Sequence, residues 1–339
     1  MSGGQLPEFA RFNPPLTDDG LICGFRIPAS GPTEPLSAGQ ASAALASTDA
    51  VTWLHFRLAD ASAERILIES NLFPAALRHR LQEHDAHTLI EATDGGLMMV
   101  VTDLSFEQVG ETSEAAGFWG FATPHTFVSA RSHALHSADS LRLALRNGLK
   151  VKSGIELVAE LLDRRNHALG ELAAGLADEV NDVEDEILRG DIREQRERLG
   201  RVRRRCAHVR RHFAPERSAL QKLLARPPAW LGPGDGERLR SALEELANLI
   251  DDANDLYERA KLLQEELAAR LAEKTGDRLY VLSILSAVLL PMTLITGIFG
   301  MNVRGLPLAE SDGAFFATML VVLGSGGLTL GLLRWKKLL

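Results

Sequence analysis

The sequence predicts an α/β domain, a long α-helical stalk and two C-terminal transmembrane helices. Three observations lead to this fold class. Runs rich in β-branched and aromatic residues alternate with short helical patterns before residue 150. Apolar residues then recur at helical spacing as far as about residue 278. Two stretches without any Asp, Glu, Lys or Arg follow near the C-terminus, at 279–303 and 313–333.

The composition limits the classes of function that the chain can have. A length of 339 residues allows one or two soluble parts beside a membrane part, and a formal net charge of -8 argues against a nucleic-acid partner while suiting cations. The only cysteines, Cys23 and Cys206, are too far apart in sequence to suggest a disulfide framework or a zinc finger. No nucleotide-binding loop or catalytic grouping is readable, so we expect neither an enzyme nor a cofactor.

The N-terminal part is expected to be mixed α and β. Residues 1–20 are rich in Pro, Gly and polar residues and are expected to form a poorly ordered leader. An α/β domain is expected over 21–150. Its expected strands are 21–27, 51–58, 97–106, 117–122 and 126–130, and its expected helices are 62–70 and 74–83.

Long helices are expected next. Apolar three-and-four spacing predicts a helical hairpin over 151–225, whose second helix, 192–224, is dense in arginine. Acidic residues of the first helix could concentrate cations, but we favour their pairing with these arginines. After a break rich in Pro and Gly, a stalk helix is expected over 237–278. No proline interrupts it before Pro291, so it is expected to continue into the first apolar stretch as a rod approaching about 100 Å.

The apolar stretches 279–303 and 313–333 are each long enough to cross a bilayer as a helix, and the short loop 304–312 makes them a transmembrane hairpin. A buried hairpin of a soluble core is the alternative, but core helices seldom stay free of charge for so long. The basic tail 334–339 places the C-terminus, and with it the N-terminal region, in the cytoplasm. Gly327 and Gly331 are expected to let the second span pack closely on the first.

The end of the first span carries a family resemblance. Gly300-Met301-Asn302, with Phe299 before it and a hairpin and basic tail after it, resembles the CorA family of divalent-cation transporters. The following residues, 303–307, are more similar to the zinc-transporting (ZntB) branch than to the magnesium and cobalt branch, whose acidic Met-Pro-Glu-Leu motif is absent. The resemblance implies a homopentameric funnel in a bacterial-type inner membrane, with the stalk helix lining the pore.

Five residues of the first span fall at helical steps and can share one face. In a symmetric ring the hydroxyls would supply oxygen ligands, while the leucines would form apolar constrictions. The alternative is that the hydroxyls bond back to their own helix. Most of these positions also match pore-facing offsets of the CorA family. The expected pore-lining residues are Leu279, Leu282, Ser286, Leu290 and Thr293.

The selectivity filter implied by the resemblance is Gly300, Met301 and Asn302. Amide oxygens from a ring of Asn302 could hold a hydrated divalent ion transiently through its water shell, because Mg²⁺ gives up water reluctantly. Gly300 and Met301 are expected to shape the turn. The span contains no Cys, His or carboxylate, which argues against a tight metal site within the membrane.

Two further groups could bind metal. His84 and His87 could meet on one helical face as a regulatory zinc site, although surface histidines are commoner. His208 and His212 are four residues apart, but Cys206 lies about 160° away on the helical wheel, which disfavours a shared site of all three.

The function expected is transport of divalent cations, Zn²⁺ foremost, across the inner membrane. Its partners would be identical chains in a pentamer, the transported cations and the lipid bilayer, with no nucleic acid. An Mg²⁺ or Co²⁺ channel of the same fold is the first alternative. A membrane-anchored coiled-coil scaffold without conduction is the alternative of another class.

Overall fold

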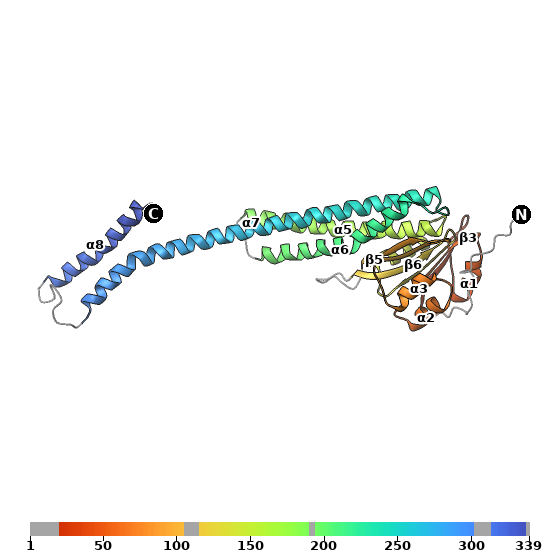
Figure 1. Cartoon of the computed structure of the whole chain (residues 1–339), viewed down its shortest axis with the longest axis horizontal. Coiled ribbons are helices and arrows are strands. Elements are labelled where there is room, and N and C mark those ends of the chain that lie inside the picture. Colours follow the sequence, from red (N-terminus) through yellow and green to blue (C-terminus); the bar gives the residue numbers. More distant parts are fainter. Residues whose placement is uncertain (1–19, 105–114, 190–193, 302–312, 337–339) are drawn as a thin grey trace. The chain divides into compact units, whose positions relative to one another are not determined.

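The computed structural model describes residues 20–104, 115–189, 194–301 and 313–336 (Figure 1). These residues form two compact units, 1–263 and 264–339, which are described separately. The expected leader (1–20, apart from Gly20), the interhelical loop 304–312, Asn302 and the last residues of the tail lie outside the described residues.

The first unit is built on one seven-stranded sheet with the order β2-β1-β3-β7-β6-β5-β4. Only the central pair β3 and β7 is parallel, and every other neighbouring pair is antiparallel. All of β3 is buried except its last residue, so both of its faces are covered. The strands are β1 (Leu21–Pro28), β2 (Glu34–Pro35), β3 (Ala50–Arg57), β4 (Leu89–Ala92), β5 (Leu97–Leu104), β6 (Ala115–Ala122) and β7 (Thr126–Arg131).

Helices cover both faces of the sheet. Alternate side chains of each strand point to opposite faces, so both faces carry apolar side chains that must be covered. Leu54, Phe56 and Phe121 share one core with α1 (Ala38–Ala46), α2 (Ala61–Glu69) and α3 (Ala75–Gln82). Trp53, Phe118 and Phe127 share the other core with α4 (His136–Arg146) and the long helices α5 (Gly154–Leu188), α6 (Gln195–Ala225) and α7 (Pro233–Phe299) (Figure 1).

The start of α5 is fixed against the β6–β7 turn. The Ser153 side chain accepts a hydrogen bond from the Glu156 N–H at 2.9 Å and caps the helix. A Cβ added to Gly154 would lie 2.2 Å from the Thr126 carbonyl oxygen, so only glycine fits here. This close approach sets where α5 leaves the sheet.

A buried ion pair joins the helices of this unit. Arg165 of α5 donates to Glu216 of α6 at 2.7 Å through Nη1, while its Nη2 lies 2.6 Å from the second carboxylate oxygen. Arg165 also stacks over Phe213 and donates to the Thr102 carbonyl of β5 at 3.3 Å. Both charged side chains are almost wholly buried, so the pair connects α5, α6 and the sheet without water.

The second unit consists of the end of α7 and the helix α8 (Ala314–Trp335). Both helices contain an apolar stretch long enough to span a membrane. No residue of that stretch in α7 is buried within the single chain.

The five expected strands are confirmed where the structure describes them, with ends shifted by no more than two residues; residues 105 and 106 of one of them lie outside the description. The two expected short helices are confirmed as α2 and α3. The short elements β2, β4, α1 and α4 were not predicted from the sequence. The long helix α7 begins at Pro233 rather than at 237, because proline is well suited to a first helical turn.

Candidate ion-conduction pathway

Helices α7 and α8 pack through a glycine. In α8, Val322 and Gly326 are buried, and a Cβ on Gly326 would lie 3.0 Å from the Met292 sulfur of α7. Gly327 and Gly331 face open space, with no atom within 4 Å of an added Cβ. The expectation that these two glycines form the close contact is therefore wrong, because the helix turns the neighbouring position, Gly326, toward α7.

The contact with α8 divides α7 into two faces. The residues on the α8 side are partly shielded, whereas all five expected pore-lining residues are exposed. At about 100° per residue, the centres of the two sets lie roughly 170° apart on the helix. The partly shielded residues are Ile284, Val288, Pro291, Met292, Ile295 and Phe299.

The exposed face is largely apolar. Leu279 and Leu282 are each 58% exposed and Leu290 is 70% exposed, although leucine in a soluble protein is usually buried. Near the end of the helix, Leu290, Thr293, Leu294, Gly297, Ile298 and Met301 line a shallow groove of about 470 Å³. The groove joins two expected pore-lining residues to one residue of the expected filter.

The Thr293 hydroxyl donates back to the Leu289 carbonyl at 2.8 Å, as in the alternative considered for these side chains. Thr296 does the same toward Met292 at 3.1 Å. A hydroxyl that donates one hydrogen bond keeps oxygen lone pairs, so this bond orients the Thr293 oxygen without removing it as a ligand.

The end of α7 shapes the first two residues of the expected filter. The helix ends at Phe299, and the Gly300 N–H donates to the Thr296 carbonyl at 2.9 Å. The Met301 N–H donates to the Ile298 carbonyl at 3.3 Å, which tightens the last turn. Met301 is 51% exposed, and Asn302 follows outside the described residues.

A sequence profile described as "CorA-like Mg2+ transporter protein" matches residues 48–335. The chain belongs to the CorA family. The resemblance of the Gly-Met-Asn end of the first span is thereby confirmed, and the family is one of divalent-cation transporters rather than enzymes.

The alignments with two named relatives extend over most of the chain. It is 26% identical over 297 residues to a zinc transport protein ZntB of Yersinia enterocolitica, covering 87% of this chain and 89% of that protein. It is 25% identical over 308 residues to the divalent cation transporter CmaX of Pseudomonas aeruginosa, covering 90% of this chain and 92% of CmaX.

Two solved structures share this architecture. Full-length CmaX superposes with a TM-score of 0.79 at 24% identity, covering 94% of this chain and 98% of CmaX. The CorA magnesium transporter of Methanocaldococcus jannaschii gives a TM-score of 0.74 at 16% identity, covering 92% and 98%. The predicted fold class, a soluble α/β part with a long helix and two C-terminal apolar helices, is thus confirmed as the CorA fold.

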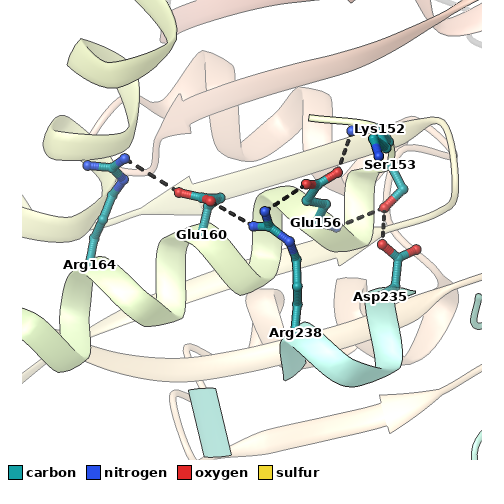
Figure 2. Close-up of polar contacts among 7 residues, drawn as sticks. All are labelled: Lys152, Ser153, Glu156, Glu160, Arg164, Asp235 and Arg238. Carbon is teal, nitrogen blue, oxygen red and sulfur yellow. Dashed lines mark hydrogen bonds and ion pairs between the residues drawn. The ribbon is translucent and has the colours of Figure 1, made fainter. Parts of the chain in front are cut away.

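A charged network fastens the first turns of α7 to α5 in the first unit. Figure 2 shows Arg238 of α7 between two carboxylates of α5, with Glu160 at 2.8 Å and Glu156 at 3.2 Å. One turn earlier, the Ser153 hydroxyl donates to Asp235 at 2.8 Å. Sequence reasoning missed this network, because the two helices are separated in the chain by the whole of α6.

The neighbouring Asp163 has a carboxyl group with a raised pKa. Burial raises its pKa to about 6, and nearby Glu160 and Glu245 add to the rise, while Arg238 and Arg164 oppose it.

The acidic residues farther along α5 are largely paired with arginines. Glu179 lies 3.9 Å from Arg198 and 3.7 Å from Arg201, and Glu186 accepts from Arg198 at 2.8 Å. Glu184 pairs with Arg259 of α7. The predicted pairing with the arginine-rich helix is therefore confirmed for Glu179 and Glu186, whereas Glu184 pairs with an arginine of α7 instead.

The expectation that His84 and His87 share a helical face is wrong. Helix α3 ends at Gln82, and His84 has a positive φ of 53° in the turn that follows. His87 contacts Asp85 at 2.5 Å, and His84 lies 3.1 Å from the Leu81 carbonyl. Among the described residues, no group of three or more His, Cys, Asp or Glu is arranged to hold a metal ion.

Proposed function

We propose that the chain forms a homopentameric pore that carries divalent cations, Zn²⁺ foremost, across the inner membrane. One observation carries the proposal: the exposed face of α7 opposite α8 holds Leu279, Leu282, Ser286, Leu290 and Thr293. Apolar surface on the outside of a helix pair can face lipid, but a face that also repeats hydroxyls suits a pore shared by identical helices. The basic tail supports a cytoplasmic position for both termini.

In this proposal Asn302 forms the selectivity filter with Gly300 and Met301. A ring of neutral amides attracts a hydrated divalent ion through its water shell and releases it readily. Below it, the Thr293 and Ser286 rings supply oxygen ligands, and the leucine rings gate the path by excluding water. The first span has no Cys or His in its sequence, so Zn²⁺ meets no tight ligand that would hold it back.

Zn²⁺ is favoured over Mg²⁺ by the named relatives, which include several ZntB proteins at 22–26% identity. An Mg²⁺ or Co²⁺ channel is the second candidate, because the matching family profile is described as an Mg²⁺ transporter and the fold is also that of a CorA magnesium transporter. The filter sequence is common to both.

Uptake into liposomes separates these candidates. The purified full chain is reconstituted, and entry of Zn²⁺ and of Mg²⁺ is followed with and without an imposed proton gradient. Zn²⁺ entry well above Mg²⁺ entry supports the proposal, and a response to the gradient identifies a coupled transporter. Mg²⁺ flux that ignores the gradient favours the second candidate.

A scaffold without conduction makes a different prediction. It would give no flux of either ion and a monomer by light scattering in detergent. A pentameric mass together with flux contradicts it, and a monomeric mass contradicts the proposed pore.

A further inference from the structure

A pair of histidines on α6 lies apart from the proposed pathway. His208 and His212 are the only two of the ten histidines spaced by four residues. Residues at this spacing are neighbours on one helical face, and two histidines so placed form the core of a well-known helical zinc motif. Their ring centroids are 4.2 Å apart, at an interplanar angle of 42°.

Both rings are available as ligands. Neither forms a hydrogen bond or ion pair with any other described residue, whereas His79 and His167 lie 3.3 and 3.6 Å from glutamates on their own helices. Burial lowers the pKa of both rings, with nearby Arg211 adding to the effect on each and His212 adding to that on His208. Both shifts favour the neutral imidazole, which is the form that binds metal.

We propose that His208 and His212 form a two-histidine chelate for a borderline divalent metal ion such as Zn²⁺, Ni²⁺ or Cu²⁺. Two nitrogens that each bind one zinc ion at about 2.0–2.1 Å can be no more than about 4 Å apart, which requires adjacent rings such as these. The remaining ligands are water. This site does not depend on which ion the pore carries.

The surroundings set the selectivity and strength of the site. Cys206 takes no part, because it is buried and burial raises its pKa to about 11. Mg²⁺ prefers oxygen ligands and is excluded. The positive charge of Arg211 opposes a divalent ion, so the chelate fills when the metal is abundant rather than at trace concentration.

The first test needs no variant. Cu²⁺ is added below one equivalent to the tag-free full chain in detergent, and its electron paramagnetic resonance spectrum is recorded. Cu²⁺ is the strongest binder of its series, so it fills the site first. We expect the signature of two coordinated imidazoles, lost on adding excess Zn²⁺ and unchanged by Mg²⁺. Absence of a two-imidazole signature overturns the proposal.

Variants then locate the site. Calorimetric titration with Zn²⁺ should show one fewer site per chain in the double variant His208→Ala/His212→Ala. Loss of an outer-shell partner alone commonly costs about 10- to 100-fold in metal affinity, so each single variant should weaken binding at least about tenfold. His167→Ala is the matched control, since it also removes a helical histidine but leaves the pair intact. A two-imidazole signal that persists in the double variant contradicts the assignment.

Discussion

The two units of the chain differ in how far the chain itself buries and pairs their side chains. In residues up to 263 the buried charges find partners within the chain, as Arg165 and Glu216 do at 2.6–2.7 Å. In the second unit, from residue 264 onward, most large side chains of the two apolar stretches remain exposed, with Leu290 at 70% and Phe316 at 76%. The first unit therefore completes its own core, whereas the second leaves a large apolar surface uncovered within the single chain.

Helix α7 shows the contrast within one element. In its first half, Leu239, Leu246 and Ile250 are no more than 1% exposed. In its last third, Leu282 and Leu285 are more than half exposed. One continuous helix thus passes from a buried core to an apolar surface that the single chain leaves uncovered.

The largest effect on transport is expected at the filter. Asn302→Ala removes the amide that is proposed to form the filter, so selective uptake of Zn²⁺ into liposomes should fall to the level of protein-free vesicles. The pentameric mass in detergent should be unchanged, because the residue follows the end of α7 rather than its packed face. Uptake equal to that of the unaltered chain would refute the filter assignment.

The largest effect on stability is expected in the first unit. Arg165→Met leaves Glu216 buried without its partner and should cost about 3–5 kcal/mol in the free energy of unfolding. The double variant Arg165→Met/Glu216→Leu should recover most of this loss, because no unpaired charge remains. Denaturant unfolding of the full chain in detergent, followed by circular dichroism, measures both. Equal losses in the single and double variants would mean that packing, not the charge, is at stake.

A smaller effect should distinguish neighbouring glycines of α8. Gly326→Leu forces the new side chain against Met292 and should destabilise the helix pair by about 1–3 kcal/mol. Gly327→Leu is the matched control, because its position is open. Thermal stability of the detergent-solubilised oligomer reports the difference. The same loss in both variants would contradict the packing through Gly326.

The smallest effect concerns pH. The folded-state pKa of Asp163, about 6, lies above the ordinary aspartate pKa of 3.8, so the folded chain holds this proton more tightly than the unfolded chain. This carboxyl therefore lowers stability as the pH rises from about 4 to 6. Asp163→Asn should raise stability at pH 7 by no more than about 1 kcal/mol, because the group is partly solvated.

Denaturation of Asp163→Asn at pH 5 and at pH 7 tests this directly. The gain should be larger at pH 7 than at pH 5. Asp178→Asn, a change on an exposed part of the same helix, serves as the control. A gain that is the same at both pH values would mean that the Asp163 carboxyl does not titrate in this range.

The sequence by itself determined the elements in which a pattern of apolar residues repeats along the chain. The strands β1, β3, β5, β6 and β7, the two apolar helices and the shared face of Leu279, Ser286 and Thr293 all follow from periodicity, because each residue's position on its own helix or strand fixes the side it presents. The Gly-Met-Asn motif that follows α7 in the sequence indicated the family.

Only the tertiary structure decided the contacts between elements distant in the chain. Three contacts depend on which faces of the helices meet after packing. They are the ion pair of Arg165 with Glu216, the ion pair of Arg238 with Glu160 of α5, and the contact of Gly326, rather than Gly327, with α7. The short β4 likewise owes its place to pairing with β5. A periodic pattern states which side of an element avoids water, but not which other element covers it, since that is settled by the combined fit of the whole core.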